Sequence, residues 1–185
     1  MDVVAHREAW PQEFESVAAI LGRAGAPGVL SIEHVGSTSV PGLAAKDVID
    51  VQVLVTDLHR ESLIARFSAV GFRLRPEEWN NIETSRSGPE SKLVFASPVD
   101  ARRANVHVRT DKSHGAYDTL LFRDYLRDVA AIRDAWGTFK QSIVRAAPDI
   151  DLIGYGQIKQ PAWAILMASA DYWARDHNRS PRSKR

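Results

Sequence analysis

The first clear pattern of apolar positions lies near the start of the chain and has the period of a helix. Within residues 10–23, apolar side chains recur at spacings of three and four residues, namely Phe14, Val17, Ala18 and Leu21. This spacing places them on one face of an α-helix, and Pro11 suits a first helical turn. The pattern predicts an amphipathic helix that ends near Gly22 or Gly25.

Two runs that follow have the composition of strands. Residues 29–33 are a short apolar run, and residues 48–55 are rich in β-branched side chains and too short for a typical helix. Between them, residues 36–42 contain two glycines, a proline and a Ser-Thr-Ser cluster, which interrupt regular structure. We therefore expect a strand, an irregular turn and a central strand in succession.

The rest of the chain alternates between the same two kinds of pattern. One helix is predicted at residues 56–71, and a polar segment at residues 80–91 is expected to be mobile. The long helix near the C-terminal end has a predicted break near Asp128. Three further strands are expected at residues 72–74, 92–96 and 105–108. Two long helices are expected at residues 118–146 and 161–174.

This alternation predicts a single α/β domain over residues 1–176. A chain of 185 residues is too short to divide comfortably into two independent cores, and it shows no linker or internal repeat. The basic tail at residues 177–185, which contains serine and proline, is expected to be frayed.

Composition and charge exclude several classes of function. The chain has no cysteine, which excludes disulfides, thiolate nucleophiles and cysteine zinc sites. Its net charge is +1, so no overall field attracts nucleic acid or an anionic membrane. No apolar run has the length of a membrane span, and the charged first ten residues do not resemble a signal peptide. A cytoplasmic protein without a membrane partner is expected.

A single carboxylate interrupts the apolar strand at residues 48–55. Side chains on a strand alternate between faces, so Asp50 and Gln52 point to one face and the valines between them to the other. Asp50 has two explanations. Either it lies at a strand end and pairs with Lys46 or an arginine, or it binds a metal ion.

The turn before that strand has the materials of a phosphate-binding site. Its glycine allows a ligand to approach the backbone closely, and its hydroxyl and N–H groups can bond phosphate oxygens. Lys46 adds a compact positive charge. The residues of this turn are Gly36, Ser37, Thr38 and Ser39.

This segment closely resembles the signature of the GrpB family (UPF0157 type), a group within the nucleotidyltransferase superfamily. The resemblance rests on His34-Val-Gly-Ser-Thr-Ser-Val-Pro-Gly-Leu-Ala-Ala-Lys and the following Ile49-Asp50-Val51. It extends over most of the chain, through an N-terminal helix, a histidine strand, a later helix and two C-terminal residues. These parts are Trp10-Pro11 with Phe14, Val106-His107-Val108, Leu121-Phe122-Arg123-Asp124-Tyr125-Leu126-Arg127, Tyr155 and Lys159.

The resemblance implies an α/β (α+β) fold with a nucleotidyltransferase-like mixed sheet flanked by helices. In such a site the glycine–serine turn holds nucleotide phosphates, and strand carboxylates hold Mg²⁺. The expected function is Mg²⁺-dependent use of ATP or another nucleoside triphosphate to activate a hydroxyl, amine or carboxylate of a small-molecule acceptor. The expected phosphate contacts are Gly36, Ser37, Thr38, Ser39, Lys46 and Arg123.

One position departs from the superfamily pattern. The paired carboxylates read Asp50-Val51-Gln52, so the second is a neutral amide, which offers an oxygen to Mg²⁺ but no charge. Asp47 stands where the family signature has a proline and is a secondary candidate for the missing charge. On a continuing strand, however, Asp47 points to the opposite face from Asp50.

The histidine strand supplies the expected partner of Asp50. Asn105, His107 and Arg109 share one face by alternation, and the resemblance indicates that this face meets Asp50. His107 is then a general base, a neutral metal ligand or, when protonated, a phosphate contact, and the alternative is a hydrogen-bonded strand histidine. The expected catalytic residues are Asp50 and His107, and the expected metal ligands are Asp50, Gln52 and His107.

Other polar residues carry smaller expectations. His34 is expected to fix the turn by bonding its backbone. Arg123 is a candidate triphosphate contact, whereas the adjacent Asp124 cannot share its helix face and is expected to be a surface or capping charge. The candidates for the acceptor side of the site are Lys140, Tyr155 and Lys159, against the alternative that such lysines are solvated.

A second function fits the same residues. A nucleotide-binding or regulatory module that has lost turnover would keep the phosphate turn and tolerate Gln52. Some family members are fused to dephospho-coenzyme A kinase, which implies a link to coenzyme A metabolism. The chain itself has no G-x-x-x-x-G-K-[S/T] loop. A nucleic-acid partner is not expected, because the net charge is near zero and no strand carries an aromatic and basic platform.

Overall fold

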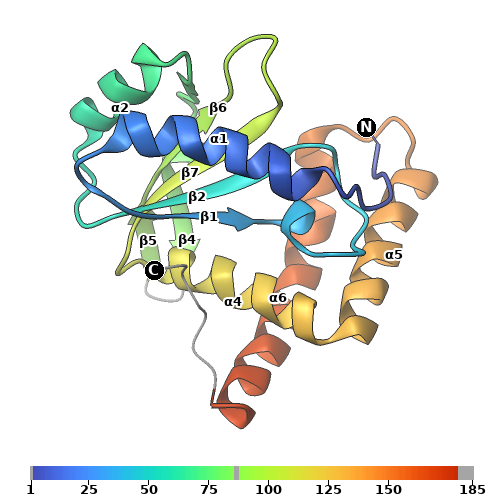
Figure 1. Cartoon of the computed structure of the whole chain (residues 1–185). Helices are drawn as coiled ribbons and strands as arrows, with labels where there is room; N and C mark the ends of the chain where they lie inside the picture. The colour runs from blue at the N-terminus through green and yellow to red at the C-terminus, as the bar shows by residue number, and fades with distance from the viewer. Residues whose placement is uncertain (1, 86–87, 179–185) are drawn as a thin grey trace.

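A five-stranded mixed sheet forms the centre of the protein (Figure 1). The computed structural model describes residues 2–85 and 88–178, so most of the tail predicted at residues 177–185 lies outside the described residues. In spatial order the strands are β1 (Val29–Val35), β2 (Ile49–Val55), β7 (Ala104–Thr110), β6 (Leu93–Ala96) and β3 (Arg73–Leu74). The strands β2 and β7 are parallel, and the other neighbours are antiparallel. The predicted mixed sheet flanked by helices is confirmed.

One face of the sheet is apolar and is covered by α1 (Trp10–Gly25) and α2 (Arg60–Ala69), the two helices above the sheet in Figure 1. Successive side chains on a strand point to opposite sides, so alternate valines of β2 and β7 face these helices. The buried cluster between the two layers includes Trp10, Leu21, Val51, Val53, Phe67, Val106 and Val108. Removing this apolar surface from water stabilises the arrangement of sheet and helices.

The other face of the sheet is polar and lies against α4 (His114–Asp128). Two further helices, α5 (Ala130–Ala146) and α6 (Leu152–Asp176), pack on α4 through a second apolar cluster. This cluster includes Leu121, Leu126, Trp136, Met167 and Trp173. The helix break predicted near Asp128 is confirmed, because α4 ends there and α5 begins at Ala130.

The last helix is longer than the one predicted at residues 161–174. It begins at Leu152, where the side chain of Asp151 accepts a hydrogen bond from Gly154 N–H at 2.7 Å and caps the first turn. Pro161 lies inside the helix and not at its start. Packing on both sides of the proline maintains the helix despite the hydrogen bond that proline cannot donate.

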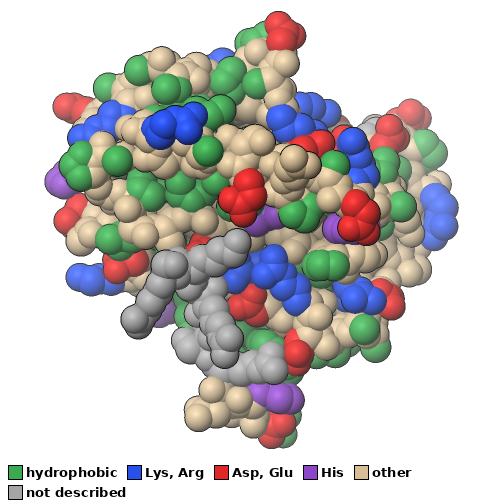
Figure 2. All heavy atoms as spheres, in the orientation of Figure 1, with side chains coloured by type: hydrophobic (Ala, Val, Ile, Leu, Met, Phe, Trp, Pro, Cys, Tyr) green, Lys and Arg blue, Asp and Glu red, His purple; other side chains and the backbone are tan. Residues whose placement is uncertain are grey.

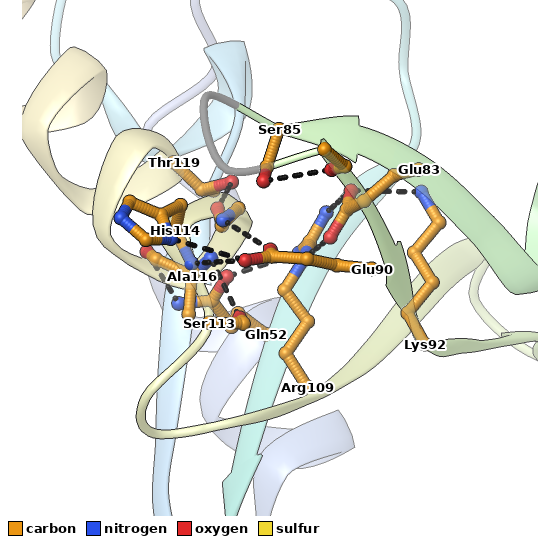
Figure 3. Close-up of polar contacts among 12 residues, drawn as sticks. Gln52, Glu83, Ser85, Glu90, Lys92, Arg109, Ser113, His114, Ala116 and Thr119 are labelled. Atoms are coloured by element: carbon orange, nitrogen blue, oxygen red, sulfur yellow. Dashed lines mark hydrogen bonds and ion pairs between the residues drawn. The ribbon is translucent and has the colours of Figure 1, made fainter.

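The described residues of the polar segment at 80–91 form regular structure, where the sequence predicted a mobile connection. Its described part forms the end of α3 (Glu78–Asn81) and a hairpin of β4 (Ile82–Ser85) and β5 (Gly88–Ser91). Glu83 accepts hydrogen bonds from Arg109 at 2.6 and 2.8 Å, and Glu90 accepts from the first two backbone N–H groups of α4, both at 3.0 Å. A carboxylate is favourable at a helix N-terminus. These long-range charged contacts hold the hairpin and leave no periodic pattern in the sequence (Figure 3).

The remaining elements agree with the sequence to within a few residues, except that α2 is shorter than the helix predicted at residues 56–71. On the face shown in Figure 2, basic and acidic side chains are interspersed, which accords with the net charge of +1. Among the described residues, the structure contains no helix with the length and apolar character needed to cross a membrane.

Candidate functional site

The turn after β1 packs directly against the carboxylate of Asp50. Val35, the last residue of β1, is the register partner of Asp50, so the chain that leaves β1 passes over this side chain. Gly36 has φ +66°, and a Cβ built there would lie 2.8 Å from Asp50 Cβ and closer still to Oδ2. Only glycine allows the backbone to approach the carboxylate this closely.

A Gly36→Ala variant is expected to lose about 3 kcal/mol of unfolding free energy, because a positive φ and a steric clash coincide at this position. Urea denaturation measures the loss. Gly42→Ala is a matched control, since Gly42 also has a positive φ of +79° but its Cβ would meet only Arg133 at 3.6 Å or more. Equal losses in the two variants would contradict the proposed contact between the turn and Asp50.

Asn105, on the neighbouring parallel strand β7, is the register partner of Asp50. Its Nδ2 donates to Asp50 Oδ1 at 3.3 Å, and its Oδ1 accepts from Arg75 Nη2 at 3.0 Å. Burial raises the pKa of Asp50, and the Asn105 hydrogen bond and the charges of nearby lysines oppose that shift. Strand alternation places Asn105 on this face, but an asparagine alone does not mark a site in the sequence.

Three lysines interact electrostatically with Asp50 and come from different elements: Lys46 from the loop before β2, Lys140 from α5 and Lys159 from α6. Burial lowers the pKa of Lys46 to about 8 and that of Lys140 to about 7. The charge of Lys159 lowers both pKa values further, and Asp50 opposes these shifts. Burial also lowers the pKa of Lys159. Ammonium groups outnumber carboxylates here, which is the charge balance of an anion-binding site.

Specific contacts position these lysines. Lys140 is 2% exposed, and its Nζ donates to Ala44 O and, at 2.7 Å, to Ser37 Oγ, so it ties α5 to the turn. Lys46 Nζ lies 4.2 Å from the centroid of the Tyr155 ring, a cation–π distance. The alternative of a solvated surface lysine is therefore wrong for Lys140. The expectation that Lys140, Tyr155 and Lys159 bind the acceptor stays a prediction.

The three hydroxyls of the turn, which forms the short helix η1 (Ser37–Ser39), differ in their surroundings. Ser37 Oγ contacts the α5 lysine, whereas Thr38 and Ser39 are buried. Thr38 Oγ1 lies 3.0 Å from Nε2 of His34, and Ser39 Oγ donates to Gly36 O at 2.6 Å. His34 therefore contacts the Thr38 hydroxyl within the turn that the sequence predicted it to fix. Thr38 and Ser39 shape the turn, and Ser37 is the hydroxyl that faces the lysines.

Gln52 stands where the superfamily pattern has a second carboxylate, and its amide is already bonded at both ends. Its Oε1 accepts from Arg109 Nη1 at 3.0 Å, and its Nε2 donates to Ala116 O at 3.2 Å (Figure 3). A guanidinium against this oxygen disfavours a cation at the same place. The structure gives Gln52 a part in holding the sheet to α4, and its role as a metal ligand stays a prediction.

His107 is the register partner of Gln52 and therefore lies on the same face as Asp50. Its Nδ1 is buried without a hydrogen-bond partner, one of three such side-chain atoms in the described part of the chain. Burial lowers the pKa of His107 well below its ordinary value, and the charges of Arg109 and Lys92 add to this effect. A neutral imidazole favours the general-base interpretation over a protonated phosphate contact.

Arg123 lies between α4 and β1, away from the surface. Its Nη1 donates to Glu33 Oε2 at 3.0 Å and to His34 O at 3.2 Å, and the Glu33 side chain is 2% exposed. Its Nε donates to Asp124 Oδ1 at 2.7 Å, so Asp124, expected to be a surface or capping charge, pairs with its neighbour. The long arginine side chain bends back to its neighbour. A phosphate contact for Arg123 stays a prediction, because these bonds already engage the guanidinium.

Asp47, the secondary candidate for the missing charge, is engaged in a separate cluster. It accepts hydrogen bonds from Arg7 at 2.6 Å, from Trp10 Nε1 at 2.8 Å and from Arg102. Burial raises the pKa of Asp47, but the hydrogen bonds from Trp10 and Arg102 and the charges of Arg102 and Arg7 outweigh it and lower the pKa. Asp47 therefore links the N-terminal segment to the loop before β7.

The donor atoms around Asp50 do not fit a pair of magnesium ions. Magnesium prefers several oxygen ligands, with carboxylates among them. Among the residues that the structure describes, no group of three or more His, Cys, Asp or Glu side chains could hold a metal ion. The side-chain oxygens of Asn105 and Gln52 accept from Arg75 and Arg109, and three lysines face the one carboxylate.

Solved structures share this fold. The crystal structure of conserved protein GrpB from Enterococcus faecalis has a TM-score of 0.75 and 31% sequence identity, and the match covers 93% of this chain and 99% of that one. Cid1 poly(U) polymerase with bound MgGTP matches with a TM-score of 0.51 and 15% identity, over 74% of this chain and 43% of that one. The second likeness shows that the fold is of the nucleotidyltransferase type.

Sequence relatives point to the same family. A UPF0157 protein of Streptomyces coelicolor is 34% identical over 142 residues, which cover 76% of this chain and 69% of the relative. A dephospho-CoA kinase of Mycolicibacterium paratuberculosis is 32% identical over 183 residues, and the match covers 89% of this chain but only 44% of the kinase. The family model described as GrpB protein matches residues 1–168, and the chain therefore belongs to the GrpB family.

Proposed function

We propose that this chain binds a nucleoside triphosphate beside Asp50 and transfers its nucleotidyl group to a small-molecule acceptor. The observation that carries the proposal is the packing of the Gly36 backbone on the Asp50 carboxylate, with Ser37 and Lys140 bonded beside it. A glycine turn next to a carboxylate and buried ammonium groups suits a phosphate chain that reacts at one end.

The proposed reaction needs a base, a leaving group and charge neutralisation. The acceptor hydroxyl, amine or carboxylate attacks the α-phosphorus, a new bond to phosphorus forms, and the bond to the β-phosphate oxygen breaks to release pyrophosphate. The buried Asp50 carboxylate, with its raised pKa, takes the proton of a hydroxyl or amine acceptor. The neutral imidazole of His107 is the second candidate base on this face. The side-chain oxygens around Asp50 do not fit a pair of magnesium ions, so the proposed reaction has no step at a bound metal ion.

A second candidate is a nucleotide-binding module without turnover, which the contacts of Gln52 favour. The position of a second carboxylate is filled by an amide that bonds Arg109 and Ala116. Similarity to a dephospho-CoA kinase that is more than twice as long suggests that such a module acts beside coenzyme A chemistry.

Calorimetric titration with ATP, CTP, GTP and UTP, followed by a pyrophosphate-release assay over a panel of acceptors, tests the proposal. Binding of at least one nucleotide with release of pyrophosphate on one acceptor supports the enzyme. Binding without release on any acceptor supports the module. The absence of binding for all four nucleotides would contradict both candidates.

A further inference from the structure

The charges around Asp50 are unusual for a site that relies on magnesium. One carboxylate faces three lysines, and the two neighbouring amide oxygens already accept from arginines. An ammonium group donates hydrogen bonds to phosphate oxygens and cannot bind a cation. The protein side of this site therefore supplies positive charge rather than metal ligands.

We propose that Lys46 and Lys159, with the charge of the buried Lys140 added to theirs, bind the triphosphate directly and that Mg²⁺ is not required for this binding. The inference rests on the proposed nucleotide function and names the form of the substrate, a polyphosphate without its metal ion. Lysine ammonium groups here take the place that bound magnesium has in sites with several carboxylates.

The positions of the lysines support direct binding. They come from three separate parts of the chain, and all three act electrostatically on the same carboxylate. Lys140 is held by Ser37 and Ala44, next to the turn that would receive the phosphates. Lys46 lies over the Tyr155 ring. A ligand therefore meets lysines that packing has already positioned, which lowers the entropy that binding would otherwise cost.

The electrostatics of the lysines point the same way. Burial lowers the pKa values of all three lysines, the charge of Lys159 lowers those of Lys46 and Lys140 further, and Asp50 opposes these shifts. The negative charge of a bound polyanion raises the pKa values of the lysines and so favours their protonated form. The protein should therefore take up protons when it binds the polyanion near pH 8. A magnesium site made of carboxylates would take up none at this pH.

The direct experiment compares the affinity for ATP in excess EDTA with the affinity in excess Mg²⁺, by calorimetry on the full chain. We expect the dissociation constant in EDTA to be at most about threefold higher than in Mg²⁺, because the charge-assisted bonds to the lysines remain. A loss of more than about tenfold in EDTA, restored by Mg²⁺, would overturn the inference and leave the nucleotide function standing.

Binding of inorganic tripolyphosphate in EDTA distinguishes phosphate binding by the lysines from the nucleotide function. Its binding without any ATP binding would support the role of the lysines and contradict the nucleotide function. If neither compound binds in either medium, both proposals fail.

Two variants test which groups bind the phosphates. Lys46→Met and Lys159→Met should each weaken ATP binding in EDTA by about tenfold or more, because each removes a charge-assisted hydrogen bond. Lys112→Met, at an exposed position outside the site, serves as the control and should leave the affinity unchanged. Thermal unfolding identifies any variant that fails to fold.

Affinity should also rise as the pH falls from about 9 to about 7, because Lys46 and Lys140 gain protons over this range. This dependence should become weaker in Lys46→Met. A pH-independent affinity in the wild-type protein, or two lysine variants that fold and bind as the wild type does, would overturn the inference.

Discussion

An Arg123→Met variant is expected to lose about 3 to 5 kcal/mol of unfolding free energy, because it would leave the Glu33 carboxylate buried without its cationic partner. Glu33 and Arg123 are 2% and 5% exposed, and their ion pair joins the edge strand β1 to α4. Removing the guanidinium also removes a bond to His34 O, next to the turn. Urea denaturation monitored by circular dichroism measures the loss.

Two comparisons separate the buried pair from ordinary surface charges. Arg133→Met breaks the pair between Arg133 and the exposed Asp134 and should cost less than about 1 kcal/mol. The double variant Glu33→Gln with Arg123→Met should recover part of the loss, because a neutral amide is easier to bury than a carboxylate. An Arg123→Met protein that is as stable as the wild type but binds nucleotide poorly would instead favour the phosphate contact predicted from the sequence.

The half of the site that contains Gly36 and Asp50 could be predicted because its parts are close in sequence. An antiparallel pair of strands that follow one another in sequence brings the residue that ends the first strand opposite the start of the second. Alternation along β7 likewise predicted that Asn105 and His107 share a face, and the parallel register with β2 bears this out. Alternation predicted the shared face, and the resemblance to the GrpB signature indicated that this face meets Asp50.

The lysine half of the site depends on tertiary packing and could not be predicted in the same way. Lys140 and Lys159 belong to helices whose periodicity shows a buried face but does not indicate which part of the sheet it meets. Their place beside Ser37 depends on how α5 and α6 pack on α4. The sequence therefore indicated both lysines as candidates but did not indicate that they interact with Asp50.

Charged networks caused the clearest differences between sequence and structure. Residues 80–91 were expected to be mobile because they lack an apolar pattern, yet Glu83 and Glu90 fix the hairpin through Arg109 and the start of α4. Glu33 is a further example, because its ion pair with Arg123 joins segments that are far apart in the sequence. A carboxylate within the apolar run of β1 is the signal that a buried cationic partner exists elsewhere in the chain.

Asp50→Asn is expected to separate binding from chemistry. The substitution keeps the size of the side chain beside Gly36 and removes the carboxylate that interacts electrostatically with the three lysines. Turnover should fall by about 10² to 10⁴-fold, the usual loss on removing a general base. Affinity for ATP in EDTA should remain or increase several-fold, because the lysines no longer share their charge with a carboxylate.

The measurement pairs pyrophosphate release, on the acceptor with the highest wild-type rate, with calorimetry in EDTA. Asp57→Asn, in the loop after β2, removes an exposed carboxylate near the same strand and should change neither quantity. If Asp50 acted mainly as a magnesium ligand, its loss would weaken binding in Mg²⁺ and have no effect in EDTA. The two roles therefore predict different changes in affinity, and a single isosteric substitution distinguishes a carboxylate that takes a proton from one that holds a metal ion.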